Sequence, residues 1–281
     1  MPGALGSAGS DQSGQGLLLI GCGKMGGALL TGWLERGVAG PFVAVEPNAD
    51  AVAAFRGKPG VTIVDRPEAI PAGFSPSVVL IALKPQTIDA NLPAYRRFAR
   101  ALFVSIAAGK TLAAFARLLG EAVAVVRTIP NTPAQVGRGI TVACANAHVG
   151  AAQRAQAQTL LEAVGEVGWV EDEALIDAAT ALSGSGPAYV FLLVEALTAA
   201  GIAQGLPADL AARLARVTVT GSGELLHRSA AAPAALREAV TSPKGTTAAA
   251  LAILMADEGL QALMVRAVAA ATRRSLELAS A

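Results

Sequence analysis

Two short segments of this chain combine residue types that could hold an anion. They are Ser183–Tyr189 (SGSGPAY) and Thr241–Thr247 (TSPKGTT), and each leads directly into an apolar stretch with helical periodicity. A turn of small and polar residues that opens a helix leaves several backbone N–H groups unpaired at the positive end of the helix dipole. Both segments therefore predict a site for an anion such as a carboxylate.

A third segment carries a dinucleotide-binding fingerprint. The glycines of Gly21-x-Gly23-x-x-Gly26 follow a predicted strand over Leu17–Ile20 and open a predicted helix near Lys24. In this pattern the first glycine permits a sharp turn, the second lets the backbone approach a pyrophosphate, and the third lets helix and strand pack closely. Together with the two anion-holding turns, the fingerprint indicates a reductase for a small acidic substrate.

The predicted secondary structure that must position these segments changes near Glu171, from alternating strands and helices to helices alone. Before it, short apolar runs alternate with helical stretches, which predicts a mostly parallel, doubly wound α/β sheet of Rossmann type. The predicted strands are Leu17–Ile20, Phe42–Val45, Val61–Val64, Val78–Ala82, Leu102–Ile106, Val123–Arg127 and Val167–Val170, with helices over Gly27–Arg36, Thr111–Leu119 and Ala151–Val164. After it, the predicted elements are all helices: Leu175–Leu182, Pro187–Ala203, Ala208–Arg228, Ala234–Val240, Thr247–Met255 and Glu258–Ala279.

These patterns predict two domains, a dinucleotide-binding domain over residues 17–170 and an all-helical domain over residues 171–281. Residues 1–16 are rich in Gly and Ser and have neither the charged start nor the apolar core of a signal peptide, so we predict a flexible tail.

Composition excludes several classes of partner. The net charge is +1 with no long basic run, which argues against nucleic acid and anionic membranes. Glu195 interrupts the longest apolar stretch, Ala188–Ala203, so no uninterrupted run reaches the ~18–20 residues of a membrane span. Because 53% of residues are hydrophobic and only 15% are charged, we expect the protein to hide apolar surface in subunit contacts. No cluster has the spacing of metal ligands, so we expect no metal.

Further segments make a family resemblance visible. With the two anion-holding turns and Ile20–Gly26 (IGCGKMG), the segments Leu83–Pro85, Ser105–Gly109 and Ile129–Ala134 resemble pyrroline-5-carboxylate reductase, in register from about Leu17 to Leu278. The resemblance implies hydride transfer from NADPH or NADH to the C=N carbon of the small-molecule substrate 1-pyrroline-5-carboxylate, giving L-proline in the last step of proline synthesis. It also implies a cytoplasmic homodimer, or a higher homo-oligomer built from dimers, with the helical domain at the dimer interface.

The resemblance assigns the cofactor site. Its residues are Gly21, Cys22, Gly23, Lys24, Met25, Gly26, Glu46, Ala82, Leu83, Lys84, Pro85, Ile106, Ala107, Ala108 and Asn131. Lys84 is placed beside the nicotinamide, and Asn131 either contacts the nicotinamide or caps a turn. Cys22 is either a reactive thiol beside a helix N-terminus or, as we favour, a small side chain in a tight turn.

Glu46 bears on the choice of cofactor. It ends the second predicted strand about 20 residues after Gly26, where a carboxylate accepts hydrogen bonds from the adenosine ribose and repels a 2′-phosphate. The family often uses NADPH, but Glu46 leads us to hypothesise that this chain accepts NADH, and the preference between NADH and NADPH stays open at this point. In the alternative, Glu46 points to solvent and Arg56 or Arg66 holds a 2′-phosphate.

The resemblance also assigns the substrate site, which comprises Ser183, Ser242, Lys244, Gly245, Thr246 and Glu173, with Thr247 as the catalytic residue. The backbone amides of Gly245, Thr246 and Thr247 are expected to converge on the carboxylate. Lys244 stands where the family usually has glycine, and either adds charge for the carboxylate or, as we favour, extends into solvent. Thr247 is the candidate proton donor to the ring nitrogen; otherwise it is a helix N-cap.

Glu173 aligns with a family acid near the product amine, although an acid in the run Glu171–Glu173 is commonly a solvated surface residue. Two rival functions remain open. A related cyclic-imine or 2-hydroxy-acid reductase would share the two-domain plan, but the hydroxy-acid enzymes carry a catalytic lysine that Ala188–Glu195 lacks. A nucleotide-binding scaffold without turnover is the second rival, and the intact binding turns argue against it.

Overall fold

The computed structural model describes residues 16–280 and divides the chain into two compact units. The sheet unit runs to Ala179 and includes the chain from Leu276 onward, and the helical unit is Thr180–Ser275. The tail predicted over residues 1–16 lies outside the described residues except for Gly16.

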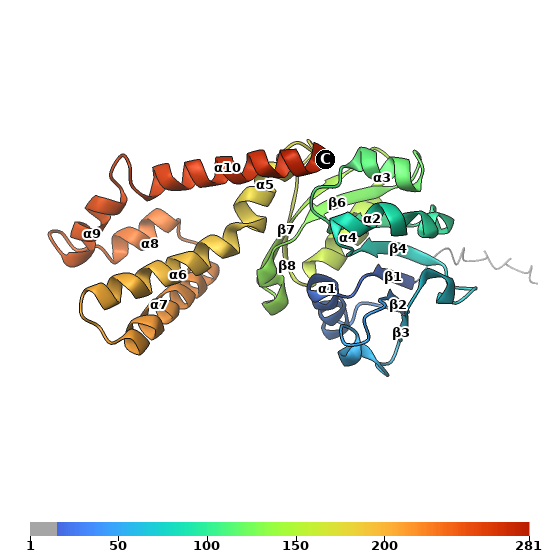
Figure 1. Cartoon of the computed structure of the whole chain (residues 1–281), viewed down its shortest axis with the longest axis horizontal. Helices are drawn as coiled ribbons and strands as arrows, with labels where there is room; N and C mark the ends of the chain where they lie inside the picture. The colour runs from blue at the N-terminus through green and yellow to red at the C-terminus, as the bar shows by residue number, and fades with distance from the viewer. Residues whose placement is uncertain (1–15, 281) are drawn as a thin grey trace, which may run out of the picture. The chain divides into compact units, whose positions relative to one another are not determined.

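The sheet unit is built on an eight-stranded sheet with the order β3-β2-β1-β4-β5-β6-β7-β8 (Figure 1). The strands are β1 (Gly16–Ile20), β2 (Phe42–Val45), β3 (Val61–Val64), β4 (Pro76–Ile81), β5 (Leu102–Ser105), β6 (Val125–Ile129), β7 (Gly139–Ala145) and β8 (Gly165–Trp169). Neighbouring strands are parallel, except that β6 and β7 are antiparallel. Since the strand order reverses between β1 and β4, this is the doubly wound sheet that the sequence predicts, with its switch point beside the fingerprint.

Helices cover both faces of the sheet, which explains why its strands are continuous apolar runs. On one face, Trp33 of α1 (Lys24–Glu35) and Leu160 of α4 (Ala151–Glu162) share a core, and the Trp33 indole donates to the Leu160 carbonyl at 2.8 Å. The other face holds α2 (Pro85–Asn91) and α3 (Leu112–Leu119). Short 3₁₀ helices join the elements: η1 (Ala53–Phe55), η2 (Pro67–Ala69), η3 (Leu92–Phe98) and η4 (Thr132–Val136).

Strand β7 is the one strand of the described sheet that the sequence analysis missed. Its sequence, GITVACA, has the β-branched residues Ile140, Thr141 and Val142 at its centre, but the small residues Gly139, Ala143 and Ala145 weaken the apolar run on either side. Small residues are needed here because β7 and β8 approach closely, and a Cβ atom on Gly165 would collide with the backbone of Gly139. Tertiary packing therefore overrides a weak local strand signal.

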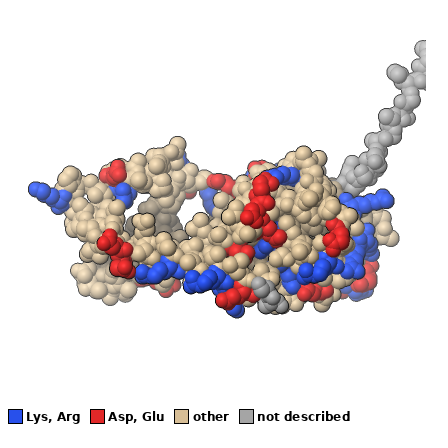
Figure 2. Space-filling model, turned by 90° about the horizontal axis from the view of Figure 1, so that it is seen from above, with Lys and Arg blue, Asp and Glu red and all other residues tan. Residues whose placement is uncertain are grey.

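The helical unit contains α6 (Gly186–Ala203), α7 (Ala208–Arg228), α8 (Pro233–Ala239), α9 (Thr246–Leu254) and α10 (Leu260–Ser280) up to Ser275, in agreement with the predicted helices. Helices α6 and α7 form a hairpin (Figure 1). They pack closely, since a Cβ on Gly201 would lie 3.2 Å from that of Ala211. Many large apolar side chains nevertheless stay exposed, among them Phe191 and Leu192, each 62% exposed. Uncharged residues dominate the surface of this unit that Figure 2 shows.

The segment Ser183–Tyr189 is not the turn that the sequence predicts. Helix α5 (Leu175–Ala179) continues into a π-helical turn, η5 (Thr180–Gly184), and then into α6. The Ser185 N–H donates to the Thr180 carbonyl at 2.9 Å, and the Tyr189 hydroxyl donates to the Ala181 carbonyl at 3.0 Å. Ser185 occupies the N-cap position of α6, but its side chain makes no capping hydrogen bond. The Ser185 N–H, which was expected to face an anion, is therefore already bonded within the helix. π-Helical turns of this kind are frequent at functional sites.

Because the helix continues through this segment, Leu175–Ala203 forms one helical stretch of 29 residues that is long and apolar enough to span a bilayer by length and composition. Asp177 and Glu195 interrupt this stretch, so it is not the uninterrupted apolar run that the sequence analysis found to be absent. Core and interface helices of water-soluble proteins pass the same test, so this stretch alone identifies no membrane protein.

Candidate active site

The fingerprint turn joins β1 to α1 at the switch point of the sheet. Gly21 has a φ of +87°, and a Cβ there would lie 2.7 Å from the Ala82 carbonyl oxygen. A Cβ on Gly26 would collide with the Gly21 carbonyl oxygen, whereas a Cβ on Gly23 would have nothing within 4 Å. Gly21 and Gly26 are therefore required by the fold itself, and Gly23 leaves open space at the N-terminus of α1. That space, with the helix dipole behind it, suits a pyrophosphate.

Glu46 lies directly after β2, and its carboxylate faces the fingerprint turn. One oxygen, Oε2, accepts from the Cys22 N–H at 2.8 Å, and the other, Oε1, accepts from the Asn48 N–H at 2.9 Å. The alternative in which Glu46 points to solvent is therefore wrong. Two backbone donors hold a half-buried negative charge beside the turn where a dinucleotide would bind.

Cys22 is buried, with 1% of its surface exposed. Burial, with the nearby Glu46 carboxylate, raises the pKa of the Cys22 thiol to about 11. The thiol is consequently neutral at physiological pH, and the reading of Cys22 as a reactive thiol is wrong. Its small side chain fills the tight turn.

Cys22 is expected to resist alkylation in the folded protein. With a pKa near 11, its thiolate forms only as the pH approaches that value, so iodoacetamide at pH 8 should react more than about 100-fold more slowly than with an ordinary cysteine. Mass spectrometry of peptides labelled with and without urea measures both rates. Labelling of Cys22 in the native protein at the rate seen in urea would contradict this assignment.

Two more predicted cofactor segments follow β4 and β5 at the same edge of the sheet. Lys84 is extended, with φ −65° and ψ 139°, and Pro85 begins α2, as expected for a residue before proline. The Ala82 N–H donates to the Ile20 carbonyl at 2.8 Å, and the Ile106 N–H donates to the Ile81 carbonyl at 3.0 Å. Because β1, β4 and β5 are neighbours, the structure brings both segments beside the fingerprint turn.

Asn131 follows β6, where its side-chain oxygen accepts from the Ile140 N–H at 2.9 Å. The amide thus ties the loop after β6 to β7, and it makes no capping hydrogen bond to η4. The amide NH₂ group remains the part of Asn131 that could meet a nicotinamide.

The turn before α9 differs from its predicted arrangement. The Gly245 N–H donates to the Ser242 carbonyl at 3.0 Å and does not face an anion. Gly245 is the N-cap residue, with an extended backbone, and a Cβ there would lie 2.5 Å from the Ser242 Oγ. A Cβ at this position would require the Ser242 side chain to move and would still lie 3.1 Å from the Ser242 carbonyl oxygen. The N–H groups without intrahelical acceptors are those of Thr246, Thr247 and Ala248.

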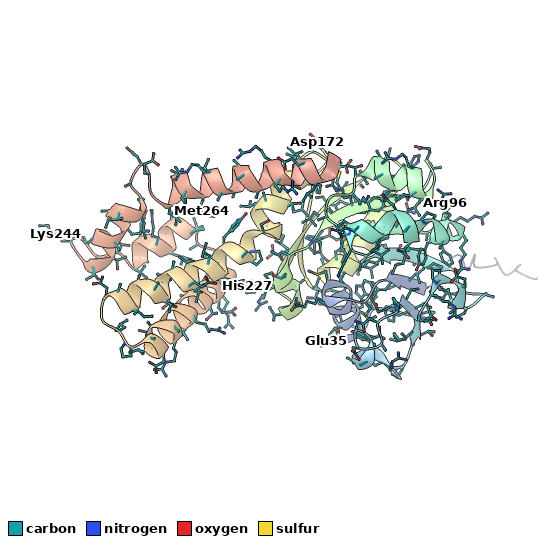
Figure 3. The ribbon with its side chains drawn as sticks, viewed as in Figure 1. Glu35, Arg96, Asp172, His227, Lys244 and Met264 are labelled. Atoms are coloured by element: carbon teal, nitrogen blue, oxygen red, sulfur yellow. The ribbon has the colours of Figure 1, made fainter. Side chains whose placement is uncertain are left out.

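Lys244 has a φ of +61°, the one positive φ outside glycine in the described chain. Its side chain is exposed and projects outward from the turn before α9 (Figure 3). A left-handed backbone is unfavourable for a residue with a Cβ, which explains why glycine suits this position in the family that the chain resembles.

Lys244→Gly is expected to raise the free energy of unfolding by about 1 kcal/mol, because glycine adopts a positive φ without strain. Urea denaturation monitored by circular dichroism measures the change. Lys244→Ala is the matched control, since it removes the charge and keeps the Cβ. An equal gain in both variants would show that charge, and not backbone strain, is responsible.

Thr247 is the second residue of α9 and is half-buried. Since Gly245 is the N-cap, the alternative reading of Thr247 as the cap is wrong. Within the described residues, the Thr247 hydroxyl takes part in no hydrogen bond. It is available to a ligand beside the N–H groups that begin the helix.

Glu173 is not a solvated surface acid. Its Oε1 accepts from the Arg127 Nη1 at 2.7 Å and from the Leu112 N–H at 2.8 Å. The sequence analysis missed Arg127 and Asp177, which join Glu173 in a cluster. In the sequence, the one feature that could have indicated this cluster is the charged Arg127 at the end of the apolar run Val123–Arg127.

Comparison with known proteins covers both units. Residues 17–109 match a family described as NADP oxidoreductase coenzyme F420-dependent, and residues 173–278 match pyrroline-5-carboxylate reductase dimerisation. A curated pyrroline-5-carboxylate reductase from Pseudomonas aeruginosa is 42% identical, over 94% of this chain and 96% of that protein. The corresponding protein of Pisum sativum is 36% identical, over 92% and 94%.

Solved structures agree with these relatives. A pyrroline-5-carboxylate reductase from Coxiella burnetii superposes with a TM-score of 0.86 at 33% identity, covering 93% of this chain and 97% of that one. Pyrroline carboxylate reductase from Plasmodium falciparum, solved with NADP bound, has a TM-score of 0.77 at 26% identity, covering 94% and 98%. Since sequence and fold agree along nearly the whole chain, this protein belongs to the pyrroline-5-carboxylate reductase family.

Proposed function

We infer that this chain reduces 1-pyrroline-5-carboxylate to L-proline by hydride transfer from NAD(P)H, the last step of proline biosynthesis. The observation that carries this inference is the fingerprint turn, in which two glycines are required by packing and Gly23 alone leaves open space at a helix N-terminus. Full-length similarity to curated reductases supplies the identity of the reaction.

The residues of the sheet unit fit a dinucleotide. Gly23 leaves room for the pyrophosphate, and the segments after β4 and β5 lie beside it. When bound, NAD(P)H supplies the hydride. The protein contributes binding and orientation, and positioning provides a large part of the acceleration in such a reaction.

In the helical unit we propose that α9 binds the substrate. The N–H groups of Thr246, Thr247 and Ala248 would hold the carboxylate, with Ser242 in the preceding turn. The exposed Lys244 side chain would add positive charge near this turn without a direct contact. The Thr247 hydroxyl would bond the ring nitrogen. Because a threonine hydroxyl is a weak acid, the imine binds already protonated or takes its proton from water through Thr247. Ser183 is half-buried in the π-helical turn, and we propose that it also contacts the substrate.

We propose that NADH is preferred over NADPH. A carboxylate held by two backbone N–H groups cannot easily swing away, so a ribose 2′-phosphate would meet its negative charge. Arg66, the alternative holder of a 2′-phosphate, is exposed and pairs with Asp65 at 3.2 Å. The NADP-bound Plasmodium falciparum relative shows that the fold also accommodates NADP.

We propose a homodimer, or a larger assembly of dimers, that works in the cytoplasm. The exposed apolar side chains of α6 and α7 lie in the region that matches the dimerisation family. A second copy would cover the exposed apolar side chains of α6, and Glu195 in the same helix would be unfavourable in lipid.

The two domains are proposed as residues 17–170 and 171–281. The dimerisation match starts at residue 173, while the compact units divide at Thr180. The difference arises because Ile176 of α5 packs against Ile129 of β6 and Cys144 of β7.

The assay that tests the function follows loss of reduced nicotinamide absorbance with 1-pyrroline-5-carboxylate, in parallel with NADH and NADPH. We expect stoichiometric L-proline, identified by chromatography. If neither cofactor is oxidised while six-membered cyclic imines are reduced, the related imine reductase is correct. Binding of NADH or NADPH without turnover of any imine would favour the nucleotide-binding scaffold.

A further inference from the structure

A buried cluster of charges lies between β6 and α5 in the sheet unit. Arg127 has 1% of its side chain exposed, and its Nη1 lies 2.7 Å from the Glu173 Oε1. Its Nη2 lies 3.9 Å from the Oδ1 of Asp177, whose side chain is 7% exposed. The cluster thus removes Arg127 and Asp177 from water, while the Glu173 side chain stays 29% exposed.

Stability alone does not explain this cluster. The Nε and Nη2 of Arg127 are buried without a hydrogen-bond partner among the described residues. A buried ion pair with unsatisfied donors commonly contributes no more stability than well-packed apolar residues of similar size. We infer that Arg127 instead orients the Glu173 carboxylate through the contact at 2.7 Å.

That carboxylate also binds the start of α3. The Glu173 Oε1 accepts from the N–H of Leu112, the first residue of α3, at 2.8 Å. Thr111, just before it, caps the helix by accepting from the Ala114 N–H at 3.1 Å. A negative charge at a helix N-terminus is also favoured by the helix dipole. Glu173 therefore holds the point where the chain leaves the loop and enters α3.

The loop in question is Ile106–Thr111, which contains the proposed cofactor residues Ile106, Ala107 and Ala108. Its other end is held through Ser105, whose Oγ accepts from the Ala107 N–H at 3.3 Å and whose carbonyl accepts from the Thr128 hydroxyl at 2.9 Å. The loop is thus tied at one end to β5 and β6, through Ser105 and Thr128, and at the other end to Glu173, which precedes α5.

We propose that Glu173 is a positioning residue that holds the loop Ile106–Thr111 in the conformation that binds the dinucleotide, with Arg127 orienting its carboxylate. This inference rests on the proposed function, which places the dinucleotide against that loop. It is an alternative to a direct contact between Glu173 and the substrate amine, and it rests on the two hydrogen bonds that the Glu173 Oε1 accepts from Arg127 and from the start of α3.

The test removes a single N–H group. Leu112 is the first residue of α3, where proline is well tolerated, and Thr111 already has the extended backbone that precedes a proline, with φ −84° and ψ 160°. Leu112→Pro therefore deletes the donor to Glu173 and keeps the helix. Leu112→Ala is the matched control, because it shortens the same side chain and keeps the N–H.

Binding of NADH and NADPH is measured directly by fluorescence titration without substrate, and kcat and KM follow. Relative to Leu112→Ala, Leu112→Pro is expected to weaken dinucleotide binding about tenfold, the loss expected for a hydrogen bond to a charged group. The kcat at saturating dinucleotide should stay within about twofold, because the reacting groups are untouched. Glu173→Ala should weaken dinucleotide binding at least as much as Leu112→Pro, because it also leaves the buried Arg127 without its ion pair. Glu173→Gln should recover part of the affinity because its amide oxygen still accepts from Leu112.

The possible outcomes distinguish failure of the positioning role of Glu173 from failure of the proposed function. If the wild-type chain binds neither dinucleotide, the proposed function and this inference both fall. If it binds them, and Leu112→Pro binds as tightly as Leu112→Ala, only the inference is overturned. A lowered Tm with unchanged dinucleotide affinity, or a Glu173→Ala effect confined to the KM for 1-pyrroline-5-carboxylate, would likewise overturn it.

Discussion

Thr247→Ala is expected to lower kcat about 100-fold while leaving the Tm nearly unchanged, since a lost donor to the reacting atom acts mainly on the transition state. The Thr247 hydroxyl takes part in no hydrogen bond within the described protein, so its removal breaks no internal contact. It stands at the second position of α9, next to the N–H groups proposed to hold the substrate carboxylate. Steady-state kinetics and thermal unfolding measure the two effects.

Two further variants make this result specific. Thr247→Ser keeps a hydroxyl at the same Cβ and should restore most of the turnover. Thr246→Ala alters the neighbouring, exposed threonine of the same helical turn and should leave kcat within about twofold. Equal kcat values for Thr247→Ala and the wild-type chain would remove Thr247 from the mechanism.

Glu46→Gln is expected to shift the ratio of kcat/KM for NADPH over NADH upward by about 10- to 100-fold, because it removes the charge that opposes a 2′-phosphate. Glutamine has the same size, and its amide oxygen can still accept from the Cys22 or the Asn48 N–H, so the fingerprint turn should keep its shape. Parallel initial-rate measurements with both cofactors give the ratio.

The matched control is Asp50→Asn, which neutralises a nearby exposed acid outside the fingerprint turn. It should change the ratio less than about twofold, because exposed charges are strongly screened by solvent. An unchanged ratio in Glu46→Gln would show that Glu46 shapes the turn without selecting the cofactor.

The sheet and its cofactor turn could be predicted from local sequence. Parallel strands covered on both faces are continuous apolar runs, and Phe42–Val45 and Val61–Val64 have the bounds that this pattern predicts. The fingerprint glycines are equally local, because the turn itself requires a positive φ at Gly21. The helical half was evident from its periodicity, and Ala208–Arg228 has its predicted bounds.

Two elements of the fold could not be predicted locally. The small residues of β7 suit close packing against β8, and that need appears only once the strands are paired. Ser183–Tyr189 has a turn-like composition, but it belongs to a helical stretch. The π-helical turn Thr180–Gly184 overlaps its start and keeps α5 and α6 continuous. In β7, strand pairing outweighs the local preference. In Ser183–Tyr189, hydrogen bonds from the Ser185 N–H to the Thr180 carbonyl and from the Tyr189 hydroxyl to the Ala181 carbonyl accompany the helical path.

The same distinction holds within the candidate site. Sequence placed an acid at the end of β2 and another before α5, but only the folded chain brings the Cys22 N–H, 24 residues away, to Glu46 and the Leu112 N–H, 61 residues away, to Glu173. The strained φ of Lys244 is likewise visible only in the folded turn. Residue type and spacing decide which chemical groups are present. The folded backbone decides which donors reach them, because a hydrogen bond needs its two atoms within about 3 Å.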